Sequence, residues 1–207
     1  MAWKDVKSES SQQNDTQKIK FTAFEEGTIQ GRILDDQPYT RWVHWIPKAN
    51  GGKGGSVTCI GKECPCCIEN AKYDKKSKPY TSRKLHSINF LNRATGEVEI
   101  LERGNALFEP LSGFLDEIGD LRNYDIKIRI SGKGKDMSYV PIPMPPKPLT
   151  EEEKKLEKYD LKEFYKPPTP EQIIMLMNGA TYREAFGTGE EDSKQGEDEQ
   201  IDVDFTK

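Results

Sequence analysis

The cysteines are the most constraining feature of this 207-residue chain, because all four lie between Cys59 and Cys67 and a histidine, His44, shortly precedes them. Cysteines so close together cannot cross-link distant parts of a small fold, so the spacing argues against a disulfide framework. A zinc ion instead takes four nitrogen or sulfur ligands from two short segments that meet across a turn. The segment 44–67 is therefore expected to fold around a metal ion or to carry thiol chemistry.

The metal hypothesis requires four ligands. Cys64 and Cys67 form a C-x-x-C pair, and Cys59 lies just before it. The glycine-rich stretch NGGKGG follows His44 and is flexible enough to fold the cysteines back over the histidine. Cys66 competes as the fourth ligand, but it adjoins Cys67, and neighbouring residues rarely reach one metal without strain. We predict one structural Zn²⁺ held by His44, Cys59, Cys64 and Cys67, with Cys66 as the alternative ligand.

Thiol chemistry is the second hypothesis for the same segment. The sequence CPCC, followed by a helical pattern, resembles the C-P-x-C motif of glutaredoxin-like enzymes, in which a helix N-terminus lowers the pKa of the thiol. In such enzymes a βαβ unit surrounds the motif, and no such pattern flanks Cys64. The metal site is therefore the preferred interpretation.

Strand patterns dominate the rest of the first 148 residues. β-Branched and aromatic residues alternate over 28–36 and 39–47, and the polar DDQP between them predicts a turn that joins a strand pair. Two further hairpins are expected at 83–104 and 124–143, with an amphipathic helix over 105–120. The expected fold class is mainly β with minor α, an OB-like, partly open barrel of five to six strands with a zinc-binding insertion and C-terminal helices. An SH3-like barrel and an α+β sheet are the open alternatives.

Composition divides the chain into four parts. Residues 1–18 are polar and predict a flexible arm, and residues 19–148 predict the OB-like core with a zinc-binding flap at 44–84. Residues 149–186 form a Pro-rich linker and a helical segment, and residues 187–207 have the composition of a disordered acidic tail. The chain has no apolar leader and no run of about 18 apolar residues, so we expect a soluble, cytoplasmic protein with no membrane association.

Charge is unevenly distributed along the chain. Residues 1–149 hold 23 Lys and Arg against 19 Asp and Glu, a net charge of +4, whereas residues 150–207 hold 8 against 16, a net charge of −8. A basic body with an acidic tail is typical of proteins that bind a polyanion. A solvated lysine-rich loop beside a disordered end is the simpler alternative.

The flap also interleaves its lysines with tyrosines. Cations follow the phosphates of a single strand, and aromatic faces stack on bases at roughly 1–3 kcal/mol each. Trp42 and Trp45 have opposite parity along their strand, so one of them at most is expected to face a ligand groove. The predicted DNA-contacting residues are Arg41, Trp42, Trp45, Lys48, Lys53, Lys62, Lys72, Tyr73, Lys75, Lys76, Tyr80, Arg83, Lys84 and Phe90.

These features together resemble the zinc-containing single-stranded DNA-binding proteins of tailed bacteriophages. The resemblance is carried by WVHWIPKANGGKGGSVTCIGKECPCC, by LHSINFLNRATGEVEIL with the short helix after it, and by the acidic C-terminus. It covers the organisation of residues 19–145, although the specific motif is only the segment 44–67. It implies an OB fold, a DNA cleft beside a zinc-holding subdomain, and His44, Cys59, Cys64 and Cys67 as metal ligands.

The same resemblance implies that the acidic tail regulates access to DNA and recruits replication or recombination proteins. The sequence departs from the family in the short loop between Cys59 and Cys64 and in an N-terminal arm with few lysines. The tail is also similar to the ends of bacterial single-stranded DNA-binding proteins, but Thr206 and Lys207 follow Phe205. The predicted partner-binding residues are Ile201, Asp202, Val203, Asp204 and Phe205.

The function expected from the sequence is sequence-independent binding of single-stranded DNA, which coats and protects the strand during replication, recombination or repair in the cytoplasm of a bacterial host. No Gly-rich phosphate loop, Ser-His-Asp set or carboxylate cluster for two-metal catalysis is present, so we expect neither an enzyme nor a small-molecule substrate. The alternatives are a zinc-stabilised adaptor between proteins and a C-x-x-C thiol oxidoreductase.

Overall fold

Seven strands form a single antiparallel sheet in the computed structural model, which describes residues 19–187. The fold is mainly β with minor α, as predicted. The predicted arm at 1–18 and the tail residues 188–207, with the predicted contacts at Ile201–Phe205, lie outside the described residues. The strands are β1 (Gly27–Ile33), β2 (Tyr39–Ile46), β3 (Gly55–Thr58), β4 (Ser82–Asn92), β5 (Val98–Arg103), β6 (Tyr124–Ser131) and β7 (Ser138–Pro146). The α-helices are α1 (Pro65–Asn70), α2 (Asn105–Ile118), α3 (Leu161–Phe164), α4 (Pro170–Met177) and α5 (Tyr182–Phe186).

The sheet follows the order β3-β2-β4-β1-β6-β7, and β5 pairs with β4. The two hairpins expected from the sequence are present as β4–β5 and β6–β7. Among the described strands, β5 and β7 do not pair with each other, so the sheet is not closed. The apolar interior lies between the curved strands and α2, with Ile88, Phe90, Leu101, Leu107 and Ile128 among its buried side chains.

The strand pair expected from 28–36 and 39–47 is not a hairpin. β1 and β2 both run antiparallel to β4, where Ile33 pairs with Phe90 and Tyr39 with Ser87. The chain between these pairs makes a kink along β4 instead of reversing. Asp35 secures the kink, because its carboxylate accepts hydrogen bonds from the backbone N–H of Asn89 at 2.8 Å and from its side chain at 2.9 Å. The DDQP segment is therefore a kink within a long interrupted strand, which corrects the predicted turn.

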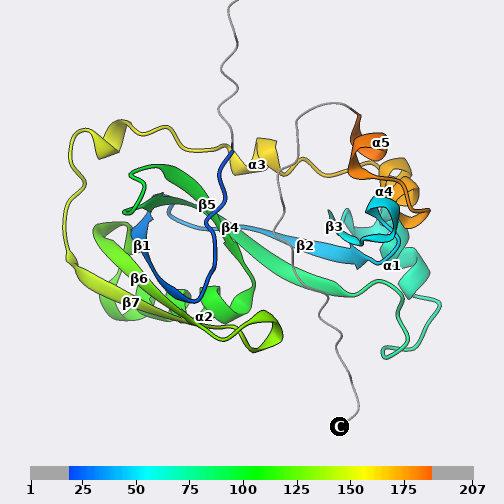
Figure 1. The fold of residues 1–207 in the computed structure, drawn as a ribbon, viewed down its shortest axis with the longest axis horizontal. Coiled ribbons are helices and arrows are strands. Elements are labelled where there is room, and N and C mark those ends of the chain that lie inside the picture. The colour runs from blue at the N-terminus through cyan, green and yellow to red at the C-terminus, as the bar shows by residue number, and fades with distance from the viewer. Residues whose placement is uncertain (1–18, 188–207) are drawn as a thin grey trace, which may run out of the picture.

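Because of this kink, β2 and the first half of β4 project beyond the curved part of the sheet as a two-stranded bridge (Figure 1). At its far end the bridge carries β3, which pairs with β2, and the short helix α1. The zinc-binding flap predicted at 44–84 corresponds to this end of the molecule.

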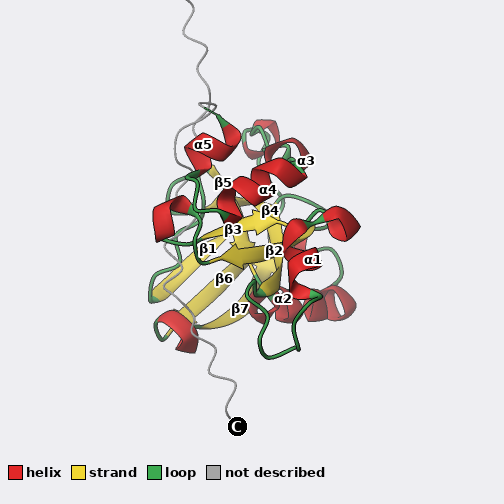
Figure 2. Cartoon of the chain, turned by 90° about the vertical axis from the view of Figure 1, so that its right-hand side faces the viewer, coloured by secondary structure: helices red, strands yellow, loops and turns green. Residues whose placement is uncertain are grey.

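Residues 147–187 run back from the curved part of the sheet to the flap along one side of the bridge (Figure 1). Leu161 and Tyr165 pack around α3 against Ile100 of the sheet. Farther along, α4 and α5 gather around the flap (Figure 2), where Ile173 and Leu176 are buried with Ile46. The segment predicted as a linker with helices therefore contributes to two separate hydrophobic clusters.

Candidate metal centre

His44 and three cysteines meet at the flap in an arrangement that could hold a metal ion. The ligand atoms of His44, Cys59, Cys64 and Cys67 all lie within 4.8 Å of one another. The His44 Nε2 atom is 3.2 Å from the Cys67 Sγ atom, and the Cys59 and Cys67 Sγ atoms are 3.5 Å apart. Tetrahedral zinc with these ligands separates neighbouring donor atoms by about 3.4–3.8 Å. The donor types fit one structural zinc ion, and the separations, from 3.2 Å to at most 4.8 Å, span the tetrahedral range.

Local structure brings the four ligands together from two directions. His44 lies on β2 opposite Val57 of β3, and Cys59 follows β3 directly, with its N–H donating to the Trp42 carbonyl at 2.8 Å. A 3-10 turn over Gly61–Glu63 then reverses the chain. Gly61 begins this turn at φ +82°, a conformation that favours glycine.

The C-x-x-C pair is set by the start of α1. Cys64 is the N-cap residue of this helix, and Pro65 occupies its first turn. Cys67 lies one helical turn after Cys64, so both thiols face the same side of the helix. The Gly61 N–H also points at the Cys59 Sγ atom at 3.5 Å and so helps to fix the position of this side chain.

Burial shifts the ionisation of the cluster. It raises the pKa of the Cys67 thiol to about 12, with further contributions from the neighbouring Cys59 and Cys64 thiols. Burial also lowers the pKa of His44, and the nearby backbone of Tyr80 opposes this effect. A neutral imidazole is the form that binds a metal, and a bound dication reverses the penalty on the thiolates by supplying the missing positive charge.

Cys66 is not one of the four converging residues, although its thiol lies beside that of Cys64. It is fully buried in the hydrophobic cluster of the flap, together with Ile173 and Leu176, and burial raises its pKa to about 12. His44 is the fourth residue, beside three cysteines, whose ligand atoms converge, and Cys66 is not among them. A reactive thiol needs a lowered pKa, and the shifts at Cys66 and Cys67 go in the opposite direction.

Two predicted DNA contacts are buried and need correction. Phe90 is 0% exposed and belongs to the hydrophobic core between the sheet and α2. Arg41 is 7% exposed, forms an ion pair with Glu102 at 2.8 Å and lies 3.6 Å over the ring of Tyr165. Both side chains stabilise the fold and are too buried to contact a DNA strand.

The other predicted contacts lie on or near the surface of the flap and the bridge. Trp42 is 53% exposed and Tyr73 is 46% exposed, whereas Trp45 is half-buried against Gly54 and Tyr80 is half-buried against the flap cluster. Opposite parity thus separates the two tryptophans as expected. Among the predicted contacts, the cationic residues that are exposed are Lys48, Lys53, Lys62, Lys72, Lys75, Lys76, Arg83 and Lys84.

Sequence reasoning missed the contribution of α4 to this site. Ile173 and Leu176 are both fully buried against the flap, and the Tyr182 hydroxyl donates to the Ser56 carbonyl at 2.8 Å. The three-residue spacing of Ile173 and Leu176, after the capping box formed by Thr169 and Gln172, was the available signal. It predicts an amphipathic helix but does not say which surface the helix covers.

No family model, curated protein or solved structure gives a significant match to this chain. Within residues 19–187, none of the helices is both long enough and apolar enough to cross a membrane.

Metal content is the direct test of the centre. We expect one zinc ion per chain in the purified protein, measured by elemental analysis against protein concentration, because four ligands from this segment fill one tetrahedral site. Cobalt substitution should give the visible absorption of tetrahedral Co²⁺ with sulfur ligands. Less than a third of an equivalent after reconstitution with zinc would contradict the assignment.

Proposed function

We propose that this protein binds single-stranded DNA without sequence dependence and coats it during replication, recombination or repair. The observation that carries the proposal is the exposed Trp42 on the open face of the bridge. Trp42 pairs with Lys84 across β2 and β4, so an aromatic surface and a cation lie side by side on one face. Stacking on the ring and neutralisation of phosphate by the amine are the two contributions that single-strand binding needs.

The strand order supports an OB-like interpretation of the barrel. If β1 and β2 are counted as one kinked strand, the pairs β1/β2–β4, β4–β5, β1–β6 and β6–β7 correspond to four of the five pairings of an OB barrel. The helix α2 lies between the third and fourth strands of that count. Arg103 of β5 donates to the Tyr139 hydroxyl of β7 at 3.1 Å, which links the two strands that an OB barrel would pair.

The two faces of the bridge differ in accessibility. The face that carries Tyr39 and Arg41 is covered, because Tyr165 stacks on Tyr39 with ring centroids 5.7 Å apart. The opposite face, which we call the bridge face, is made of Thr40, Trp42, Lys84 and His86. Thr40, Trp42 and Lys84 are exposed and His86 is half-buried. A bound single strand of DNA is therefore expected to lie on the bridge face.

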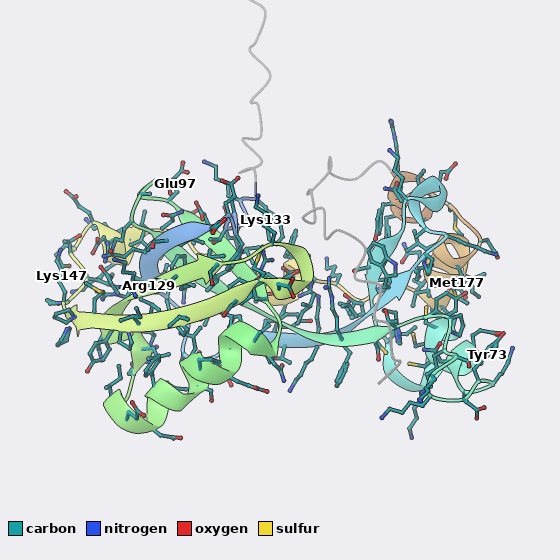
Figure 3. The ribbon with its side chains drawn as sticks, turned by 60° about the horizontal axis from the view of Figure 1, so that its bottom comes forward. Tyr73, Glu97, Arg129, Lys133, Lys147 and Met177 are labelled. Carbon is teal, nitrogen blue, oxygen red and sulfur yellow. The ribbon has the colours of Figure 1, made fainter. Side chains whose placement is uncertain are left out.

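Basic side chains lie at both ends of this face. The flap contributes the exposed Lys72, Lys75 and Lys76 in the connection between β2 and β4. Lys133 lies in the β6–β7 turn, at the end of the barrel that points toward the flap (Figure 3). These two connections correspond to the L12 and L45 loops with which OB folds contact oligonucleotides.

The wider proposal follows the family resemblance. We propose that the protein acts in the cytoplasm of a bacterial host, as the zinc-containing bacteriophage proteins do, and that residues Ile201–Phe205 recruit replication or recombination proteins. Its role is binding rather than catalysis. The zinc ion would supply structure to the flap, with His44 and the three cysteines as its ligands.

The test is fluorescence anisotropy of a labelled dT oligonucleotide. If about four cations contact phosphates, affinity should fall roughly 50-fold between 50 and 200 mM salt, and duplex DNA should compete poorly. Trp42→Ala should weaken binding about 5- to 100-fold through lost stacking. Val140→Ala, which truncates an exposed apolar side chain on β7, is the control and should bind normally. Absence of binding at low salt would refute the proposal.

A zinc-stabilised adaptor is the second candidate, and exposed apolar side chains on the flap favour it. Ile174, Met175 and Phe186 on α4 and α5 are exposed, as is Ile68 on α1. Zinc without oligonucleotide binding would favour this function, and a metal-free protein with a reactive Cys64 would favour the thiol oxidoreductase.

A further inference from the structure

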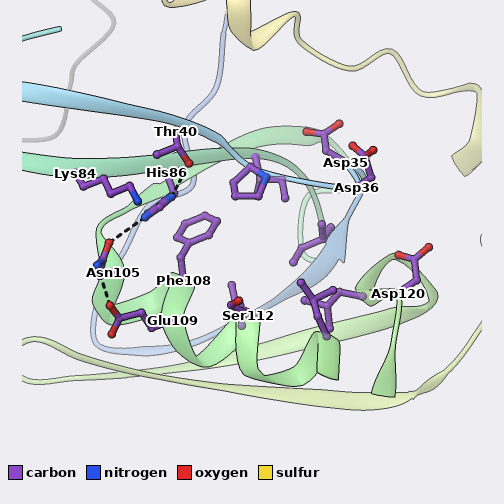
Figure 4. Close-up of a pocket in the computed structure, with 16 residues that line it drawn as sticks. Asp35, Asp36, Thr40, Lys84, His86, Asn105, Phe108, Glu109, Ser112 and Asp120 are labelled. Carbon is purple, nitrogen blue, oxygen red and sulfur yellow. Dashed lines mark hydrogen bonds between the residues drawn. The ribbon is translucent and has the colours of Figure 1, made fainter. Parts of the chain in front are cut away.

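A cavity of about 330 Å³ opens beside the bridge face, between α2 and the kink that joins β1 to β2 (Figure 4). Its apolar lining includes Ile33, Ile88, Phe108, Leu111 and Leu121. Thr40, Lys84 and His86 line the cavity and also belong to the bridge face. A DNA strand bound along Trp42 would therefore pass the mouth of this cavity. Its volume is at the lower end of the range for ligand pockets, which suits one ring system rather than a longer segment.

The polar groups at the bridge end of the cavity are already paired. His86 Nε2 lies 3.0 Å from the Asn105 Oδ1 atom, and Asn105 Nδ2 donates to Glu109 at 2.8 Å. With this orientation of the amide, Nε2 donates to Asn105, and in that tautomer Nδ1 accepts from the Thr40 hydroxyl at 2.8 Å. The imidazole also stacks on Phe108 with ring centroids 5.0 Å apart. This end offers a fixed aromatic wall and the Lys84 cation.

The other end of the cavity carries three aspartates, and only one of them is unpaired. Asp35 accepts from Asn89 and pairs with Lys158 at 3.1 Å, and Asp120 pairs with Arg122 at 2.7 Å. Asp36 is exposed and forms no hydrogen bond or ion pair with any residue from 19 to 187. Figure 4 shows Asp35, Asp36 and Asp120 opposite the end that holds Lys84 and His86. The three carboxylates outnumber Lys158 and Arg122, the two cations that pair with them, so this end favours an uncharged donor over a phosphate.

We infer that the cavity holds one unstacked base of the bound strand and prefers guanine, with Asp36 as the residue that selects it. The inference rests on the proposed function and adds one preferred base to otherwise base-independent binding. The phosphates would stay near Lys84, outside the cavity, while the ring enters along the wall of His86 and Phe108. Single-stranded bases are commonly read in this way, through stacking and hydrogen bonds to the Watson–Crick edge.

The preference for guanine follows from the hydrogen bonds that the Asp36 carboxylate can accept. The N1–H and N2–H₂ groups of guanine are adjacent donors that match the two oxygens of Asp36, which can only accept when ionised. Thymine offers a single N–H between two carbonyl oxygens, which the carboxylate would repel. Adenine and cytosine each offer one amino group beside a ring acceptor. The expected order is therefore guanine first, adenine and cytosine next, and thymine last.

The experiment compares three labelled oligonucleotides of equal length: dT alone, dT with guanine at every fourth position, and the same strand with hypoxanthine, which lacks the 2-amino group. We expect the guanine strand to bind at least about fivefold more tightly than dT, because a bidentate pair discriminates by that factor or more, with hypoxanthine between them. Asp36→Ala should remove the preference and leave dT binding unchanged or slightly tighter. Asp116→Ala removes an exposed carboxylate of α2 outside the cavity and should keep the preference.

A second variant, Ser112→Leu, fills the cavity from an exposed position on α2 and should also abolish the preference. Equal binding of the guanine and dT strands by the native protein would overturn the inference while leaving the proposed function intact. A preference that survives both Asp36→Ala and Ser112→Leu would overturn it too. If no oligonucleotide binds, the proposed function fails and the inference fails with it.

Discussion

Cys59→Ala should destabilise the protein far more than Cys66→Ala, although Cys66 is the more deeply buried of the two. Burial alone predicts the opposite order, since Cys66→Ala removes a fully buried atom from the flap cluster at a cost of about 1 kcal/mol. Cys59 instead belongs to the group of four residues that could hold a metal ion. Structural zinc contributes about 10–16 kcal/mol in small zinc peptides, so loss of a ligand should unfold the flap.

Thermal unfolding and zinc content of the two variants test this expectation. The native protein and Cys66→Ala should each carry one zinc ion and lose stability when a strong chelator is added. Cys59→Ala should have little zinc, and the chelator should hardly change it further. Hydrogen exchange in α4 gives a local readout, because Ile173 and Leu176 pack on the flap. If Cys59→Ala kept full zinc and native stability, Cys59 would not be a ligand.

The cluster that could hold a metal ion could be predicted from the sequence because the positions of its residues are fixed mostly by local structure. Cys59, Cys64 and Cys67 are separated by one tight turn and the first turn of a helix, so spacing alone places their thiols together. His44 required one long-range assumption, that the chain folds back across the glycine-rich stretch. The pairing of β2 with β3 fulfils it.

The kink between β1 and β2 could not be predicted in the same way. A polar segment with a proline indicates a reversal or a bulge equally well, and the outcome depends on the hydrogen bonds between Asp35 and Asn89, which are 54 residues apart. This kink matters for the site because it extends β2 past the curved part of the sheet. The bridge, the flap position and the cavity beside α2 all depend on it.

The burial of Phe90 and Arg41 could not be predicted either, because the elements that cover them are distant in the sequence. An alternating strand predicts one buried face and one open face, but here α2 covers one side of the sheet and α3 the other. Phe90 faces the interior, and Arg41 faces the segment that carries Tyr165. The acidic partner Glu102 lies on another strand, so nothing near Arg41 in the sequence marks it as a buried cation.

A second buried charge cluster joins the sheet to the segment after β7. Arg32 is fully buried, and its Nε donates to the Asp125 carboxylate at 2.7 Å. Arg93 donates to the same carboxylate at 2.8 and 2.9 Å and also pairs with Glu153. Arg32 further donates to the Lys147 carbonyl at 2.8 Å. Asp125 is therefore the only carboxylate, among residues 19–187, that pairs with the buried Arg32.

Asp125→Asn should lower the free energy of unfolding by about 3–5 kcal/mol, because it leaves the Arg32 guanidinium buried without a counter-charge. Asp120→Asn is the matched control. It weakens an exposed pair with Arg122 and keeps the side-chain oxygen that caps the next turn, so its cost should stay below about 1 kcal/mol. Urea denaturation at neutral pH measures both values.

The difference in the free energy of unfolding between the native protein and Asp125→Asn should also depend on pH. Burial raises the pKa of Asp125, but the hydrogen bonds from Arg93 and Arg32 outweigh burial and hold it below its usual value. A carboxyl with a lowered folded-state pKa stabilises the protein above its unfolded-state pKa of about 3.9, and this stabilisation is lost as pH falls through the folded-state pKa. The native protein and Asp125→Asn should therefore converge in stability only below about pH 4. A gap that is already small at pH 7 would mean that water or the Arg122 and Lys147 carbonyls satisfy Arg32 without the carboxylate.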